Sequence, residues 1–393
     1  MEINNYNKLK KAVIYHILID RFAGENLKTD KWDKPYFIGG NLKGIINKIN
    51  YLKQLNIDII LLSPIFETTA YHGYHITNYY NISPHFGNID DLKTLIDVCN
   101  ENNMQVWVEF VPNHCSYKHP FFADAQTNKK SRYIDWFYFI KWPEKYLCFL
   151  NFKELPKFNL KNPEVSSYFI ECAKYWIKHG IKGFKIDHII GLPQSFIKNF
   201  VSEIKKFNNN VIISGEAWLS NIPFKNLKTL GIKNKYLKWL LGFKQEKVQL
   251  EYKNSIDCIL DFCFRNILIE NLAWEKNYDE KINLIQQKLE YHYSKYPEYF
   301  MPLTFLDNHD TNRFFYECNY EIKKIKKAFE IQLNISYPAI IYYGTEAGII
   351  QKKPVNFSIP YSDLNTRMPF DWKNINKELL KFVIELIIKR KSA

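Results

Sequence analysis

The sequence lacks paired cysteine motifs and long apolar runs. Its seven cysteines are scattered, with no CxxC pair, which argues against a disulfide framework and against a zinc ribbon. No apolar stretch approaches the roughly 18 residues that a membrane span needs. The N-terminus has no charged segment followed by a long apolar run, so no signal peptide is predicted. We therefore expect a cytoplasmic protein with no membrane partner.

The net charge of +13 comes without any run of five or six basic residues. The densest cluster is Lys389-Arg390-Lys391, and elsewhere lysine is spread along the chain. A nucleic-acid binder would interleave basic residues with aromatic residues on one face, and the chain has no such segment. We expect a generally basic surface and no nucleic-acid partner.

Aromatic residues are abundant, at 17% of the chain, with 27 Tyr, 29 Phe and 9 Trp. A disordered chain would not carry so much apolar material. A large core takes most of these rings, whereas a groove lined by Tyr and Trp would use them to stack on sugar rings. Composition alone leaves both interpretations open.

Short apolar runs alternate with amphipathic stretches along the chain. Helical spacing marks residues 41–55, 88–103, 164–179, 193–207 and 377–389. Strands are predicted at residues 13–19, 57–62, 106–111, 183–187, 211–216, 256–260, 302–306 and 339–343. The alternation indicates parallel strands with right-handed crossovers, and eight such units favour an α/β fold closed as a (β/α)8 barrel. Periodicity alone leaves a doubly wound sheet as a competitor.

Carboxylates and histidines gather where the predicted strands end, the rim at which barrel enzymes place their active sites. These residues are Asp187, Glu216, Asp310, His114, His188 and His309. Each one alone has a structural explanation, since an Asp after a strand is often a helix N-cap. Several acids on one rim fit the two carboxyl groups that glycoside cleavage needs. They fit a metal site less well, because no compact ligand spacing accompanies them.

Four ordered motifs resemble those of the α-amylase superfamily of glycoside hydrolases. They are EFVPNH (109–114), GFKID (183–187), GEAW (215–218) and FLDNHD (305–310). Further matches are HGYHITNYYNISPHFG (72–87), YPAIIYYGTE (337–346) and TRMPFDW (366–372). LPKFN (155–159) is similar to a motif of the cyclomaltodextrinase and neopullulanase branch. The resemblance covers nearly the whole chain.

The resemblance implies a catalytic role for three carboxylates. Asp187 would be the nucleophile that forms a covalent glucosyl-enzyme intermediate, Glu216 the acid/base, and Asp310 the group that stabilises the oxocarbenium-like state. Enzymes of this kind retain the anomeric configuration, with the two reacting carboxyl groups about 5–5.5 Å apart. The implied substrate-binding residues are Tyr74, His114, Lys185, His188, His309 and Arg313. No cofactor is predicted, and Asn113, which matches a family calcium ligand, is the candidate metal ligand.

The same resemblance implies a barrel formed by residues 1–113 and 161–393, with a small B domain, residues 114–160, inserted after the third strand. No C-terminal β-sandwich domain is expected in the chain. The implied function is retaining hydrolysis of α-1,4-glucans such as maltooligosaccharides or cyclodextrins. A transglycosylase of the same family and a catalytically weak carbohydrate-binding barrel stay open as alternatives. An oligosaccharide is the expected partner, and the oligomeric state is left open.

Among the departures from the family pattern, two lie beside the predicted nucleophile: the family has Arg at the position of Lys185 and Asp at that of Glu109. Residues two apart on a strand share a face, so Lys185 and Asp187 should both point into the barrel. A cation beside the nucleophile favours its charged form, but Lys lacks the planar fork of donors that Arg has. Glu is one methylene longer than Asp. We hypothesise that the two changes are linked, with Glu109 reaching Lys185 to restore a buried ion pair.

Overall fold

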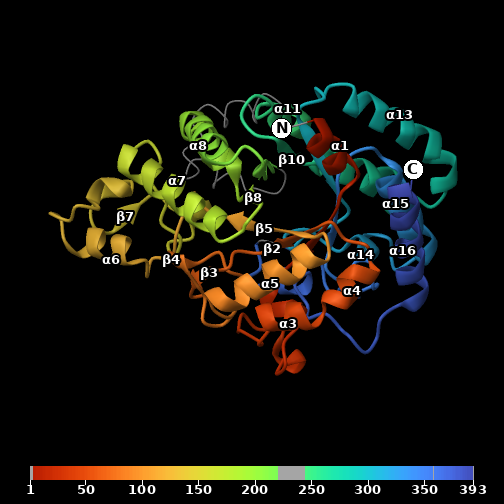
Figure 1. Ribbon diagram of the computed structural model, residues 1–393, viewed down its shortest axis with the longest axis horizontal. Coiled ribbons are helices and arrows are strands. Elements are labelled where there is room, and N and C mark those ends of the chain that lie inside the picture. Colours follow the sequence, from red (N-terminus) through yellow and green to blue (C-terminus); the bar gives the residue numbers. More distant parts are fainter. Residues whose placement is uncertain (1–2, 220–243, 357, 393) are drawn as a thin grey trace. The chain divides into compact units, whose positions relative to one another are not determined.

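A computed structural model describes residues 3–219, 244–356 and 358–392. Eight parallel strands form a closed barrel in the order β1-β12-β11-β10-β9-β8-β5-β2. Figure 1 labels β2, β5, β8 and β10 among them. Each barrel strand therefore neighbours the barrel strand that precedes or follows it along the chain. The predicted (β/α)8 barrel is confirmed, and the doubly wound sheet is excluded.

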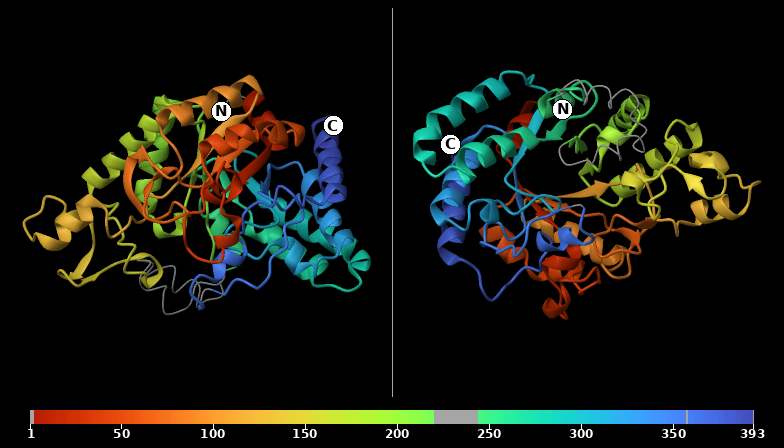
Figure 2. Two further views of the ribbon diagram at one scale, coloured as in Figure 1. Left: turned by 90° about the horizontal axis from the view of Figure 1, so that it is seen from below. Right: turned by 180° about the vertical axis from the view of Figure 1, so that it is seen from behind.

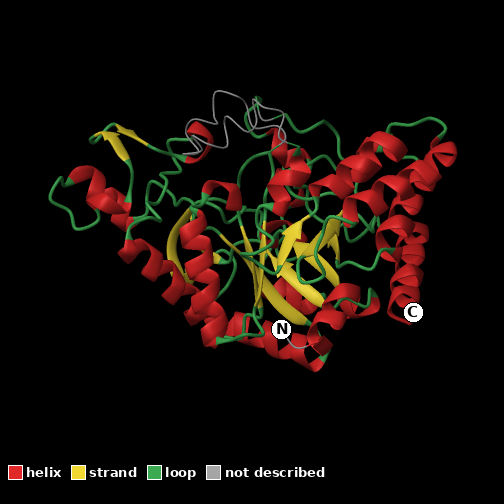
Figure 3. Cartoon of the chain, turned by 90° about the horizontal axis from the view of Figure 1, so that it is seen from above, coloured by secondary structure: helices red, strands yellow, loops and turns green. Residues whose placement is uncertain are grey.

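The barrel strands are β1 (Val13–Ile17), β2 (Ile59–Leu62), β5 (Gln105–Phe110), β8 (Gly183–Ile186), β9 (Ile212–Gly215), β10 (Cys258–Leu260), β11 (Met301–Phe305) and β12 (Ala339–Tyr342). Two short antiparallel pairs are β3 (Phe66–Thr68) with β4 (Ile76–Ile82) and β6 (Phe139–Lys141) with β7 (Lys145–Tyr146). Figure 3 shows the strands in yellow and the helices in red.

The longer helices are α1 (Ile3–Lys11), α5 (Ile89–Glu101), α6 (Pro120–Thr127), α7 (Pro163–Lys178), α8 (Gln194–Phe207), α13 (Ile282–Tyr293), α15 (Ile322–Asn334) and α16 (Lys377–Ser392). The shorter helices are α2 (Ile19–Phe22), α3 (Leu42–Asn47), α4 (Ile49–Gln54), α11 (Gln245–Leu250), α12 (Phe262–Leu268) and α14 (Phe314–Glu317). Among the described residues, no helix is long and apolar enough to cross a membrane.

The barrel strands form from continuous apolar runs because both of their faces are covered. Every residue of β1, β2, β8 and β12 is buried. Such runs are typical of parallel strands that have side chains packed on the inside and helices on the outside. This burial is why eight short runs were sufficient to predict the barrel.

The predicted helix over residues 41–55 is wrong in one respect, because the structure has two helices there. The chain breaks at Lys48 (φ −106°, ψ 11°), where its N–H donates to Ile45 O, three residues back. The Lys48 ammonium lies 4.1 Å from the ring centroid of Trp372. On the far side of the break, the Tyr51 hydroxyl donates to Glu346. Tertiary contacts on both sides of the break thus override the helical periodicity.

The chain divides into two compact units, which we describe separately. Unit 1 comprises residues 1–63, 85–107 and 260–393, and unit 2 comprises residues 64–84 and 108–259. In unit 1, α16 packs along α15 and ends at the C-terminus (Figure 2). In unit 2, α7 packs against α8, and α6 and β7 lie beyond α7.

A buried carboxyl group in unit 1 makes the stability of the protein depend on pH. Oε1 of Glu346 accepts hydrogen bonds from the hydroxyls of Tyr15 (2.7 Å) and Tyr51 (2.6 Å). Burial raises the pKa of Glu346 from 4.5 to about 7, although both tyrosines and the charge of Arg313 lower it. Between these two values the folded state binds more protons than the unfolded state. The contribution of Glu346 to the free energy of unfolding is therefore fully present below pH 4.5 and is lost as the pH rises through 7.

We expect Glu346→Gln to remove this loss, which amounts to about 3 kcal/mol above pH 7. The neutral amide can still accept from both tyrosines but has no proton to lose. Urea midpoints at pH 5 and pH 8 would measure the effect, with Glu385→Gln, an exposed carboxyl on α16, as the control. Burial also raises the pKa of Asp20, to about 6. Asp20 is present in the unmutated protein and in Glu346→Gln, so its effect on the pH dependence is the same in both and cancels in the comparison. An unchanged difference between the two pH values in Glu346→Gln would contradict the assignment.

Candidate active site

In unit 2, two buried carboxylate residues stand at equivalent positions directly after the neighbouring strands β8 and β9. Strands β8 and β9 are paired in the register Lys185↔Ser214 and Ile186↔Gly215. The next residues along the two strands are Asp187 and Glu216, which are 7% and 5% exposed. The backbone continues the ladder, since the Glu216 N–H donates to Ile186 O at 3.0 Å. Because paired residues on neighbouring parallel strands project to the same face, both carboxyl groups point the same way.

A single ammonium group connects the carboxylates of three strands. Nζ of Lys185 lies 3.0 Å from Oε2 of Glu109 on β5 and 2.7 Å from Oε2 of Glu216. Burial opposes the charge of Lys185, but the carboxylates of Glu109, Glu216 and Asp187 together raise its pKa. The lysine therefore stays charged at neutral pH. The hypothesised contact between Glu109 and Lys185 is confirmed.

A second contact of Glu109 comes from the loop after β3. The hydroxyl of Tyr74 donates to Oε2 of Glu109, the same oxygen that Lys185 contacts. Tyr74 is 8% exposed and Glu109 is fully buried. Two donors on one oxygen fix the orientation of this carboxylate.

The imidazole of His114 is buried at the start of the segment that follows β5. Its Nδ1 lies 3.3 Å from the amide Nδ2 of Asn113, and its ring stacks on Phe149 at a centroid distance of 4.6 Å. Burial lowers the pKa of His114 to about 3, with a further contribution from the charges of His75 and Lys157. The ring is therefore neutral, and the amide hydrogen bond to Nδ1 puts the proton on Nε2. Nε2 is buried and contacts no acceptor in the described part of the chain.

His188 follows Asp187 in a left-handed backbone conformation, with φ 44° and ψ 49°. This conformation is uncommon for a residue with a side chain and occurs often at functional sites. Its ring packs edge-on against Phe149 at 4.8 Å. Phe149 thus contacts both His114 and His188, two of the predicted substrate-binding residues.

The surroundings of Asn113 do not suit calcium. Oδ1 of Asn113 is buried without a hydrogen-bond partner in the described residues, and it would lie 2.7 Å from a Cβ added to Gly191. The carbonyl oxygen of Gly191 accepts a 2.7 Å hydrogen bond from Nζ of Lys157, which is itself buried. A calcium ion held by these oxygens would meet a buried ammonium group instead of the carboxylates it prefers.

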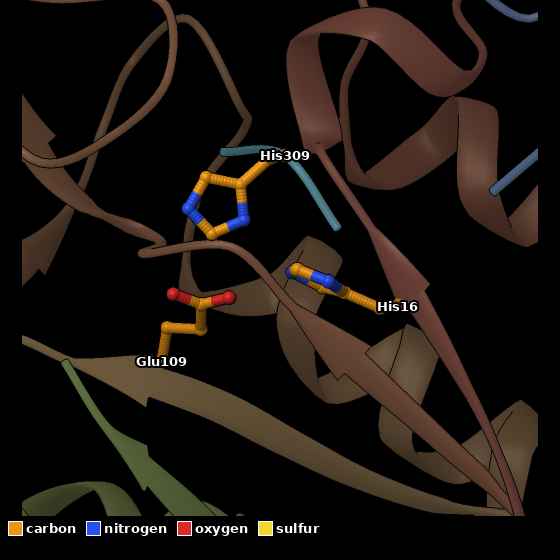
Figure 4. A group of neighbouring side chains, drawn as sticks. All are labelled: His16, Glu109 and His309. Atoms are coloured by element: carbon orange, nitrogen blue, oxygen red, sulfur yellow. The ribbon is translucent and has the colours of Figure 1, made fainter. Parts of the chain in front are cut away.

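Unit 1 carries the remaining predicted site residues, and two of them contact each other. Asp310 receives Nε2 of His309 on Oδ2 at 3.1 Å and Nη2 of Arg367 on Oδ1 at 2.7 Å. Arg367 also donates through Nε to the backbone oxygen of His309. The His309 ring packs edge-on against His16 of β1, with centroids 5.4 Å apart (Figure 4). Both oxygens of Asp310 are thereby oriented.

The predicted substrate-binding residue Arg313 is buried and is held by hydrogen bonds and ring contacts within the protein. It is 1% exposed, and its guanidinium lies 4.1 Å from the centroid of the Tyr342 ring. Its donors reach Thr366 O, Tyr343 O and Oγ1 of Thr345. These contacts join the ends of β11 and β12 to the segment after them.

Arg367, Phe149 and Lys157 were missed as site residues by sequence reasoning. Arg367 stands in TRMPFDW and Lys157 in LPKFN, two motifs that the resemblance quotes without assigning these roles. Phe149 lies in a segment with no periodicity, so no local signal marks it. Their importance lies in contacts with residues distant in sequence.

Comparison with known proteins shows which family the chain resembles. The alpha amylase catalytic domain matches residues 16–381. The chain is 33% identical over 394 residues to alpha-amylase 2 of Dictyoglomus thermophilum, covering 98% of this chain and 63% of that protein. It is 31% identical over 399 residues to a cyclomaltodextrinase of Thermoanaerobacter pseudethanolicus, covering 97% and 63%. The chain thus spans just under two thirds of the length of these relatives.

A solved structure with the same fold is the cyclic α-maltosyl-(1→6)-maltose hydrolase from Arthrobacter globiformis. The TM-score is 0.80 at 23% identity, covering 98% of this chain and 84% of that one. A closed β/α barrel with carboxylates at its strand ends places the chain in the class of β/α-barrel enzymes. The chain belongs to the α-amylase family of that class, as its match over residues 16–381 shows. The predicted resemblance is confirmed.

Proposed function

We propose that the protein is a retaining hydrolase of α-1,4-glucans, with Asp187 as nucleophile and Glu216 as acid/base. The register of β8 and β9 carries this proposal, because it makes Asp187 and Glu216 the next pair after Ile186 and Gly215. Neighbouring strands lie about 4.8 Å apart. Retaining glycosidases need their two carboxyl groups about 5–5.5 Å apart, a spacing that paired positions can supply.

In the first step, an oxygen of Asp187 attacks the anomeric carbon. The bond from that carbon to the glycosidic oxygen breaks, and its electron pair stays on the oxygen, which takes the proton of Glu216. In the second step, Glu216 removes a proton from water as the water oxygen attacks the anomeric carbon. As the water attacks, the bond from the anomeric carbon to the Asp187 oxygen breaks, and its electron pair returns to the Asp187 carboxylate. Two inversions give net retention.

The other site residues would hold the sugar and the charge that develops on it. Nε2 of His114 is a buried donor without an acceptor in the described residues, which suits a sugar hydroxyl. Asp310, with both oxygens oriented by His309 and Arg367, suits the oxocarbenium-like state. Tyr74 would stack on the sugar ring, and His188 would contact it.

Arg313 and Asn113 receive structural roles in this proposal. Arg313 supports the strand ends through its internal contacts, and its buried Nη2, which has no hydrogen-bond partner among the described residues, is the one part of it that suits a sugar hydroxyl. Asn113 supports His114 through its amide. The buried Lys157 ammonium argues against a calcium role for Asn113.

We further propose that residues 114–160 form an inserted B domain between barrel segments 1–113 and 161–393. Backbone bridges His114↔Lys157, Phe137↔Phe158 and Cys148↔Pro156 tie the segment to itself.

A cytoplasmic location is supported by the cysteines, since all seven are free thiols and six are buried. Free thiols persist in reducing compartments.

Glu216→Gln should lose activity according to the leaving group. A sugar hydroxyl is a poor leaving group that needs a proton, whereas 4-nitrophenolate is not. We expect kcat/KM, which reports the step that releases the leaving group, to fall by about 10²–10⁴-fold on maltotriose. For release of 4-nitrophenol from its α-maltoside, kcat/KM should fall at least tenfold less. Equal losses on both substrates would remove the acid role from Glu216.

Product analysis tests the proposed function directly. The panel contains maltooligosaccharides, β-cyclodextrin and pullulan, with Asp187→Asn as the inactive control. Cleavage that disappears in the control supports a hydrolase, and products longer than the substrate would identify transfer to a second sugar in place of water. Sugar binding by calorimetry without any turnover would replace the hydrolase with a carbohydrate-binding barrel.

A further inference from the structure

One lysine of unit 2 bridges two carboxylates that belong to different strands. Lys185 on β8 contacts Glu109 of β5 at 3.0 Å and Glu216 at the end of β9 at 2.7 Å. The three side chains are 2%, 0% and 6% exposed. We propose that Glu109 and Lys185 act as a matched positioning pair that sets the carboxyl group of Glu216, and that each is functional at its position only with the other. This inference rests on the proposed function, in which Glu216 is the acid/base.

The strand order gives the pair its mechanical basis. Strand β8 lies between β9 and β5 in the barrel, so the Lys185 ammonium receives one carboxylate from each neighbouring strand. An ammonium group is a compact charge with three donors on a flexible stem. Contact from both sides holds such a group in place, whereas contact from one side would let it follow that partner.

The length of Glu109 is what brings it within hydrogen-bond distance. An Asp at this position would withdraw the carboxylate by about one C–C bond, roughly 1.5 Å. The 3.0 Å contact with Lys185 would then exceed the range of a hydrogen bond. An Arg at position 185 opposite Glu109 would meet the converse problem, since its longer, planar head would crowd a buried carboxylate.

Tyr74 extends the pair toward the proposed sugar site. Its hydroxyl donates to the same Oε2 of Glu109 that contacts Lys185. The connected groups are therefore Tyr74, Glu109, Lys185 and Glu216, in that order. If Glu109 only added stability, these contacts would matter for folding but not for the chemical step of the folded enzyme.

A double-mutant cycle separates these possibilities. The variants are Glu109→Asp, Lys185→Arg and the double exchange, which restores the Asp and Arg of the family pattern. We expect each single variant to lower kcat on maltotriose at least tenfold with KM within threefold, because the pair acts on Glu216 and not on the sugar. The double variant should recover kcat to within threefold of the unmutated protein.

An ion pair outside the site supplies the matched control. Lys205 and Asp257 lie 2.8 Å apart with side chains 20% and 18% exposed. The exchanges Lys205→Arg and Asp257→Glu, which also swap Lys for Arg and change the length of the acid by one methylene, should leave kcat within twofold. A general intolerance of the barrel to such exchanges would lower kcat in these controls as well.

Three outcomes would overturn the inference. Losses in kcat that multiply in the double variant would show two independent residues, and losses confined to the unfolding midpoint would show a purely structural pair. If the unmutated protein cleaves no α-glucan, the proposed function is wrong, and Glu109 and Lys185 then have no catalytic acid to position. The matching of Glu109 with Lys185 is then judged on the unfolding midpoints of the same four proteins, where additive changes would refute it.

Discussion

Asp187→Asn is expected to lower kcat on maltooligosaccharides at least about 10³-fold without lowering stability. The amide has nearly the shape of the carboxylate but cannot attack the anomeric carbon, so the glucosyl-enzyme ester cannot form. Stability should hold because Asp187 is one of three carboxylates that act on the single ammonium of Lys185. Removing one negative charge relieves repulsion in this buried group. Single-turnover kinetics and thermal unfolding of the same sample would measure both effects.

Asp257→Asn is the control with the opposite expected pattern. Asp257 pairs with Lys205 and accepts a 2.8 Å hydrogen bond from the N–H of Ile213. Losing its charge should lower the unfolding temperature while kcat stays within twofold. An Asp187→Asn variant that retains a tenth of the original kcat, or one that fails only because it unfolds, would remove the nucleophile role from Asp187.

Arg390→Met is expected to lower the free energy of unfolding by about 3–5 kcal/mol. Arg390 lies near the end of α16 and is 7% exposed. All five of its N–H donors meet backbone carbonyls, which belong to Lys10, Lys11, Leu333, Ile335 and Tyr337. These carbonyls lie at the C-terminal ends of α1 and α15 and just before β12, where helices leave acceptors unsatisfied.

Arg390 remains positively charged although it is buried. Burial lowers its pKa to about 10, and the nearby Asp58 carboxylate opposes this change, so the guanidinium is cationic at neutral pH. A cation at the C-terminal ends of two helices also interacts favourably with their dipoles. Met fills similar space but leaves five carbonyls without a donor.

Urea unfolding of three variants would test this role. Arg390→Lys keeps the charge but has only three donors, so its loss should lie between those of the unmutated protein and Arg390→Met. Lys389→Met changes the exposed neighbour on the same helix and should stay within about 0.5 kcal/mol. A loss below 1 kcal/mol in Arg390→Met would contradict the anchoring role.

The fold was predictable because its signal is local. The barrel strands are short and mostly apolar runs, such as IILL in β2 and AIIY in β12, which are buried at every residue and are recognisable without their partners. Helix α5 begins at a capping box formed by Asn88 and Asp91, and these two residues are only three positions apart, so this signal is local as well. The helix break at Lys48 escaped prediction because its cause, the contacts with Trp372 and Glu346, lies some 300 residues further along the chain.

The sequence by itself determined the barrel and the rim on which carboxylates such as Asp187, Glu216 and Asp310 stand, because parallel strands present their C-terminal ends at one side. Tertiary structure alone decided which groups these residues meet. It brought the Lys185 ammonium between Glu109 and Glu216 and paired Arg367 with the carboxylate of Asp310. It also placed Lys157 on the carbonyl of Gly191. Such contacts join residues tens of positions apart, and their charge balance depends on burial and distance, which no local pattern encodes.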